Sequence, residues 1–111
     1  MVKLICFVKR KPGMEADEFH RYWREVHGPL IASTKSGRHV LRYEQNHRVR
    51  EHWDQAGYDG VTEQWFTSVD NFFASLQEDD YALIDADVAK FIDTDSLEWI
   101  ITEEAEVFVG G

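Results

Sequence analysis

Apolar positions in the first third of the chain follow two different periods. Residues 2–8 form a continuous β-branched and apolar run that ends before a Pro-Gly pair, which predicts a strand. Over residues 15–26 the apolar side chains share one helix face at the i, i+3, i+4, i+7 spacing: Phe19, Tyr22, Trp23 and Val26. Gly28 and Pro29 come next, and this pair predicts that the helix ends there, with His27 at its C-terminal end.

The rest of the chain alternates between short strands and helical segments. Strands are predicted over 39–49, 61–67 and 97–109, a loop over 50–60, and helices after an N-cap at Ser68 and over 80–91. The order of elements is then β-α-β-β-α-β. This order predicts an α+β fold of the ferredoxin-like kind, with an antiparallel sheet.

The predicted strand over 39–49 has no clean apolar face. Its alternation places Tyr43, Gln45 and His47 on one side and Arg42 and Glu44 on the other. Such a strand either lies at a sheet edge or faces a lined cavity. A His, a Tyr and an amide on one face form a polar patch of the kind that small-molecule sites use.

One face of the predicted sheet is left without a cover, because both helices pack on the other. A chain of 111 residues with four Trp, four Tyr and seven Phe cannot leave an aromatic face exposed to water. We therefore expect a homodimer in which two sheets pack face to face as a dimeric α+β barrel and enclose a cavity.

Composition and charge narrow the class of protein. The 13.0 kDa chain is 43% hydrophobic, enough for one domain spanning 1–111 with a real core. Its net charge is -9, which argues against a nucleic-acid partner. Residues 1–50 hold 11 Lys and Arg against 5 Asp and Glu, so the basic half and the acidic half should attract each other.

No membrane or secretion signal stands out in the sequence. The longest apolar run is far shorter than the ~20 residues of a membrane span, and the basic cluster follows the first apolar stretch instead of preceding it. The single cysteine, Cys6, lies in an apolar run and is expected to be a buried, inert thiol. A soluble cytoplasmic protein without membrane contact is expected.

The stretch FHRYWREVHGPL, from Phe19 to Leu30, resembles the EthD-domain family of the dimeric α+β barrel superfamily. Weaker likenesses follow in the same order at 43–47, 58–66 and 91–93, so that the resemblance spans nearly the whole chain. It implies a ferredoxin-like dimer whose pocket takes aromatic or small cyclic molecules, often without a metal or an organic cofactor. Methylmuconolactone methylisomerases and polyketide cyclases look similar, and the founding members are associated with ether degradation.

His27 is the first candidate for chemistry, because an imidazole exchanges protons near neutral pH. A helix C-terminus would raise its pKa. The alternative is a His that only caps the helix, and the resemblance favours a role in the pocket. His47 and Tyr43 are the further catalytic candidates, with an exposed edge-strand position as the alternative for His47.

Four residues are predicted to bind substrate: Tyr22, Trp23, Gln45 and Trp65. The alternative for the three aromatic residues is a place in the core, and alternation puts Trp65 away from Phe66. Asp93 is expected to form a turn or a cap. No metal motif, no phosphate-binding loop and no cofactor signature is found, so neither metal nor cofactor is expected.

These features together predict a cofactor-independent enzyme that acts by His acid/base chemistry on an aromatic, polyketide-like or lactone substrate. The reaction would be of the cyclase, isomerase or dehydratase type. Two alternatives stay open. One is an EthD-like oxidoreductase or monooxygenase, and the other is a non-catalytic accessory protein that binds a small hydrophobic or aromatic ligand in a degradation pathway. An imidazole and a second polar group converging on one pocket would favour the enzyme.

Overall fold

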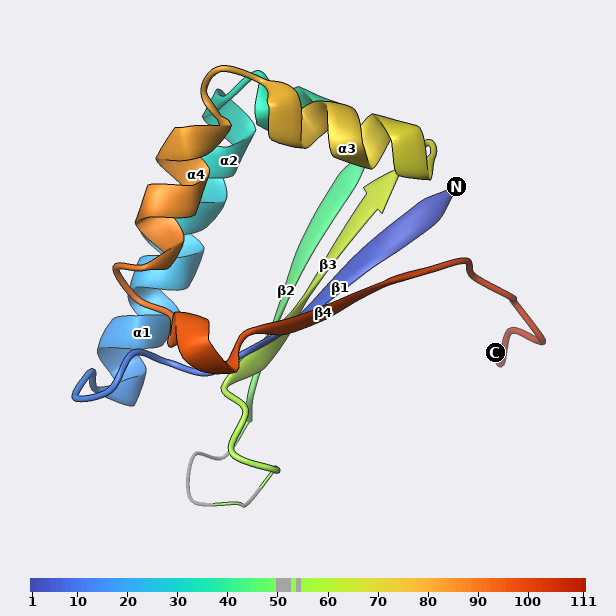
Figure 1. The fold of residues 1–111 in the computed structure, drawn as a ribbon. Coiled ribbons are helices and arrows are strands. Elements are labelled where there is room, and N and C mark those ends of the chain that lie inside the picture. Colours follow the sequence, from blue (N-terminus) through green and yellow to red (C-terminus); the bar gives the residue numbers. More distant parts are fainter. Residues whose placement is uncertain (50–52, 54) are drawn as a thin grey trace.

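Four antiparallel strands form one sheet in the computed structural model, which describes residues 1–49, 53 and 55–111 (Figure 1). The strands are β1 (Val2–Val8), β2 (Arg42–His47), β3 (Gly60–Phe66) and β4 (Glu98–Thr102), in the order β2-β3-β1-β4. The first and last strands of the chain therefore pair side by side, and the helices between them lie on one side of the sheet. This is the predicted ferredoxin-like α+β fold.

The first helical segment is longer than predicted. The α-helix α1 (Ala16–Tyr22), the π-helical turn η1 (Trp23–His27) and the α-helix α2 (Gly28–Ser33) follow one another without a break. The prediction that the helix ends at Gly28 is wrong. Gly28 N–H reaches back five residues to the Trp23 carbonyl, and Pro29, which has no N–H to donate, follows directly after this widened turn.

The widened turn also changes which side chains face inward. Phe19 and Trp23 are buried as predicted, but Val26 is 45% exposed and His27 is buried in its place. A regular helix would have kept Val26 on the face of Phe19 and Trp23, whereas the extra residue in the π turn rotates the following positions. His27 is thus a mid-helix residue and not a helix end.

The second half follows the predicted order with shorter elements: η2 (Ser36–His39), α3 (Val69–Gln77), α4 (Tyr81–Val88) and η3 (Thr94–Ser96). Ser68 caps α3 as predicted, accepting a hydrogen bond from Asn71 N–H, and Asp93 caps η3. The strand predicted over 39–49 begins only at Arg42, because a 3₁₀ turn occupies the residues before it. In the predicted loop over 50–60, residues 50–52 and 54 lie outside the described part of the chain.

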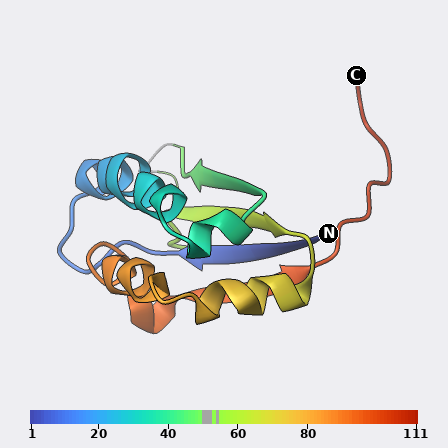
Figure 2. The ribbon, with the colours of Figure 1, turned by 90° about the horizontal axis from the view of Figure 1, so that it is seen from above.

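The strand predicted over 97–109 is also too long, since β4 ends at Thr102. Residues 103–111 carry no regular secondary structure and lead away from the rest of the chain (Figure 2). Within this segment Val107, Phe108 and Val109 are all at least three-quarters exposed.

The two faces of the sheet differ in what covers them. Two apolar clusters pack between the sheet and the helices, one around Phe19, Trp23 and Phe91 and the other around Phe66 and Phe72. The opposite face has no helix over it. It carries apolar and charged side chains from all four strands, among them Ile5, Phe7, Trp65 and Ile100.

The predicted attraction between the basic and acidic halves is present within the chain. Lys3 pairs with Glu63 at 3.0 Å, Arg10 with Asp59 at 3.2 Å, and Lys35 with Asp79 at 3.3 Å. No helix in the described residues is both long enough and apolar enough to cross a membrane.

Candidate functional site

A cavity of about 250 Å³ lies between the sheet and the helices. Most of its wall is apolar and comes from both core clusters, with contributions from Leu4, Trp23, Phe66, Phe72 and Trp99. The polar side chains on the wall are fewer: His27, Tyr43, Thr62, Gln64, Tyr81 and Asp85 are among them. The arrangement is the usual one of a small-molecule site, an apolar hollow with a few fixed polar groups.

His27 reaches this cavity from the π turn and is held by Asp87 of α4. The distance between His27 Nδ1 and Asp87 Oδ2 is 2.8 Å, and both side chains are almost fully buried. The second Asp87 oxygen accepts a hydrogen bond from the Tyr22 hydroxyl. The carboxylate is therefore satisfied on both oxygens, and it fixes the position of the imidazole ring.

The electrostatics of His27 differ from the sequence-based expectation. Burial lowers the pKa of His27 below its ordinary value, and the Asp87 carboxylate opposes that effect without overcoming it. The expected rise from a helix C-terminus does not occur, because the helix continues past His27. A neutral imidazole that donates Nδ1–H to a carboxylate keeps its lone pair on Nε2.

Nε2 of His27 is the nitrogen left for a ligand. No hydrogen-bond partner for it is found among the described residues, while Nδ1 is engaged by Asp87. A carboxylate that sets the tautomer and orientation of a His beside a substrate pocket is the arrangement found in general-base catalysis.

Asp87 is the functional residue that sequence reasoning missed. It lies in the predicted helix over 80–91, on the same face as Ile84 and Val88, where an acidic residue interrupts an apolar stripe. That interruption could have indicated a functional residue, because a carboxylate that is buried with an apolar stripe needs a polar partner. Its partner is 60 residues away in the sequence.

Tyr43, Gln45 and His47 share one face of β2, as the alternation predicts, and this face of the edge strand is turned toward the helices. Tyr43 lines the same cavity as His27, so the structure brings these two candidates together. Gln45 and His47 are not part of that wall. They line a surface groove together with Arg24, Pro29 and Tyr43, so Tyr43 borders both the cavity and this groove.

The four predicted substrate-binding residues occupy different places. Trp23 lines the cavity, whereas Tyr22 binds Asp87 and does not face the ligand space. Trp65 lies on the uncovered face of the sheet, where the cations of Lys3 and Arg42 approach its ring to 4.9 Å and 5.1 Å. Alternation along β3 separates Trp65 from the cavity, since its neighbour Phe66 takes the inward position.

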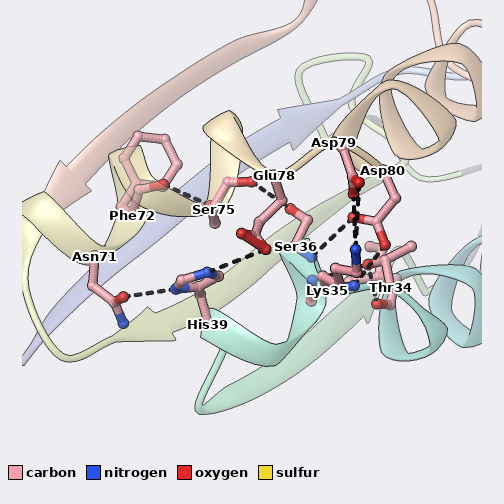
Figure 3. A network of polar contacts seen from close by, with 12 residues as sticks. Thr34, Lys35, Ser36, His39, Asn71, Phe72, Ser75, Glu78, Asp79 and Asp80 are labelled. Atoms are coloured by element: carbon pink, nitrogen blue, oxygen red, sulfur yellow. Dashed lines mark hydrogen bonds and ion pairs between the residues drawn. The ribbon is translucent and has the colours of Figure 1, made fainter.

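A polar network joins the part of the cavity wall that contains Ser36 and Ser75 to the residues around it (Figure 3). The carboxylate of Asp80 accepts hydrogen bonds from the backbone N–H groups of Lys35 and Ser36, at 2.7 Å and 3.1 Å. Ser36 Oγ donates to the Ser75 carbonyl at 2.8 Å, and both of these serines line the cavity. The network therefore joins η2 to α3 and to the start of α4 and holds this part of the wall in place.

Among the described residues, no three His, Cys, Asp or Glu side chains come close enough to one another to hold a metal ion. Cys6 lines the cavity, and burial raises the pKa of its thiol to about 11. The thiol is therefore protonated at neutral pH, in keeping with the predicted inert role.

Comparisons with known proteins agree with this fold. A sequence model of the EthD domain matches residues 11–95. No curated protein matches the chain.

Three solved structures are similar to the chain. An EthD family protein from Bacillus halodurans is 19% identical with a TM-score of 0.73, covering 95% of this chain and 99% of its own. A dimeric ferredoxin-like protein of unknown function from Bacteroides fragilis is 12% identical, with a TM-score of 0.67 and coverage of 93% and 95%. A protein from Nitrosomonas europaea, provisionally described as an antibiotic biosynthesis monooxygenase, is 14% identical, with a TM-score of 0.60 and coverage of 94% and 98%. At such identities the likeness concerns the fold.

Proposed function

The chain belongs to the EthD domain family, and we propose that it is an enzyme that moves protons on a small uncharged cyclic substrate without a cofactor. The observation that carries this proposal is the buried His27–Asp87 pair on the wall of an apolar cavity. A neutral imidazole with a fixed tautomer is a general base, and the same group returns the proton as an acid.

The reaction class follows from what one imidazole can do. His27 Nε2 takes a proton from a carbon next to a carbonyl group, and the electron pair of the C–H bond moves onto the carbonyl oxygen as an enolate. The imidazolium then returns the proton to carbon in an isomerisation, or to a departing hydroxyl group in a dehydration. Asp87 stabilises the imidazolium while it carries the proton.

The size and charge of the cavity restrict the substrate. Benzene fits an apolar protein cavity of about 150 Å³, so a cavity of about 250 Å³ suits one substituted ring or lactone better than a fused polyketide. No Lys or Arg of the described residues lines the cavity, and Asp85 adds a negative charge. An anionic substrate would therefore lack a partner, which favours an uncharged one.

Deuterium exchange tests this function without knowledge of the natural reaction. The protein is incubated in D₂O with a panel of uncharged single-ring ketones and lactones, and loss of the carbon-bound proton is followed by NMR. We expect exchange above the buffer rate for at least one compound, reduced roughly 10²–10⁴-fold in His27→Gln. His39→Gln is the matched control, since His39 binds Asn71 outside the cavity.

Two further measurements, of oxygen uptake and of ligand binding, separate the two alternatives. Oxygen uptake on an electrode with a phenolic compound would support an oxygenase, the activity provisionally given to the Nitrosomonas europaea protein. Ligand binding without exchange or oxygen uptake would support a non-catalytic binding protein. Exchange at the same rate in the wild type and in His27→Gln would contradict the proposed role of His27.

A homodimer is part of the proposal. The uncovered sheet face carries Ile5, Phe7, Trp65 and Ile100, and Ile100 is 51% exposed. Burying this face against a second copy would remove apolar surface from water and leave the cavity on the other side of each sheet. The dimeric neighbour from Bacteroides fragilis supports this assembly.

A further inference from the structure

A chain of side-chain hydrogen bonds runs from α1 along β2 to the cavity. His20 Nδ1 and His47 Nδ1 are 2.7 Å apart, His47 Nε2 and Gln45 Oε1 are 2.8 Å apart, and Gln45 Nε2 is 3.0 Å from the Tyr43 hydroxyl oxygen. Of these four residues only Tyr43 lines the cavity, and the His27–Asp87 pair uses none of them.

The backbone carbonyl of Trp23 sets the direction of this chain. It lies 2.7 Å from Gln45 Nε2, and a carbonyl oxygen can only accept. The amide nitrogen of Gln45 therefore donates one proton to Trp23 and its other proton to Tyr43. The amide oxygen faces His47, so His47 carries its proton on Nε2 and donates it to Gln45.

The protonation of the two histidines is consistent with this direction. Burial, with the charges of His20 and Arg24, lowers the pKa of His47 to about 4, so the ring is neutral at pH 7. A neutral ring protonated on Nε2 has its lone pair on Nδ1, and His20 Nδ1–H donates to it. Every hydrogen bond in the series thus points toward Tyr43.

The Tyr43 hydroxyl group still has its own proton to donate. Its oxygen already accepts from Gln45 and from the indole N–H of Trp23, and no acceptor for its own proton is found among the described residues. Burial raises the pKa of Tyr43, so the phenol keeps this proton at neutral pH. A hydroxyl that accepts on one side has its proton available on another, and Tyr43 lines the cavity.

We propose that Tyr43 is a fixed hydrogen-bond donor to an oxygen atom of the ligand in the cavity, and that Gln45 and His47 are positioning residues that aim it. This inference rests on the proposed function in that it concerns the same cavity. It specifies the ligand further: an uncharged cyclic molecule with a carbonyl or ether oxygen opposite His27. During proton abstraction the same donor would stabilise the enolate oxygen.

Binding of a matched pair of ligands tests this role apart from catalysis. Acetophenone and ethylbenzene differ mainly in the carbonyl oxygen, and their dissociation constants are measured by NMR titration. We expect the wild-type protein to prefer acetophenone. Tyr43→Phe should reduce that preference about fivefold, the factor for one hydrogen bond of about 1 kcal/mol, and leave ethylbenzene binding nearly unchanged.

Variants of Gln45 and His47 test whether these two residues position Tyr43. Gln45→Leu should reduce the preference for acetophenone by a similar factor, and His47→Leu by a smaller one. His47→Gln should restore it, because an amide can still donate to Gln45. Tyr58→Phe is the matched control, since the Tyr58 hydroxyl binds Glu98 and does not line the cavity.

Three outcomes would overturn the inference. They are an unchanged preference in Tyr43→Phe, an equal loss of both ligands in Gln45→Leu, and failure of both ligands to bind the wild-type protein at millimolar concentration. The proposed function can fail independently of this inference. If the ligand preference depends on Tyr43 but no deuterium exchange occurs, the cavity is a binding site and the proposed enzymatic activity is wrong.

Discussion

Replacement of Asp87 by Asn tests the least expected part of the site. Asn has the same shape as Asp but only one accepting oxygen, whereas Asp87 accepts from both His27 and Tyr22. If the amide nitrogen faces His27, the ring must accept on Nδ1, and its proton moves to Nε2. If the nitrogen faces Tyr22, His27 keeps its tautomer but loses the negative charge that stabilises the imidazolium.

Both orientations predict a loss of rate. Deuterium exchange should fall roughly 10²–10⁴-fold, the range for a disabled general base. The free energy of unfolding should fall by about 1–3 kcal/mol, because the hydrogen bonds of His27 and Tyr22 both lose their charged acceptor. The stability loss is smaller than the stability of most domains, so the variant should still fold and its rate can be measured.

Three measurements on one sample separate these effects. Urea unfolding gives the stability, nitrogen NMR of the imidazole gives the tautomer, and deuterium exchange gives the rate per folded molecule. Asp70→Asn, in the first turn of α3, is the matched control. Wild-type exchange by folded Asp87→Asn would refute the reasoning, because His27 would then not need its carboxylate.

Three further predictions concern pH, packing and assembly. Stability should rise with pH between about 4 and 6.5, because the unfolded chain binds a proton that half-buried His47 does not, and urea unfolding of His47→Gln should show a shallower rise. Gly60→Ala should cost about 1–3 kcal/mol in thermal or urea unfolding, since a Cβ there would lie 2.5 Å from both the Asn46 carbonyl oxygen and the Trp23 ring; an unchanged midpoint would mean that the β2 backbone and the ring both move aside freely. Light scattering should give the mass of two 13.0 kDa chains, and Ile100→Asp should reduce it to one whereas the similarly exposed Leu83→Asp should not; a wild-type monomer would exclude the dimer.

The order of strands and helices could be predicted because it depends on local periodicity. Alternation also placed Tyr43, Gln45 and His47 on one face of their strand and separated Trp65 from Phe66, and the structure agrees with both. Periodicity carries no information on a single extra residue in a helix, so the π turn was missed, and with it the inward rotation of His27. Asp87 was missed because its role depends on a contact between two distant helices.

The π turn explains how four residues at a constant spacing of four can share one buried face of the helix. Phe19, Trp23, His27 and Ile31 are all buried. In a regular α-helix, at about 100° per residue, the last of them would be rotated about 120° from the first. A turn that takes up one additional residue reduces this drift to about 20°, which keeps the imidazole in line with Trp23 before it and Ile31 after it. The length of this helix is therefore as important as its composition, since a one-residue insertion elsewhere along it would turn either Phe19 or Ile31 away from the cavity side.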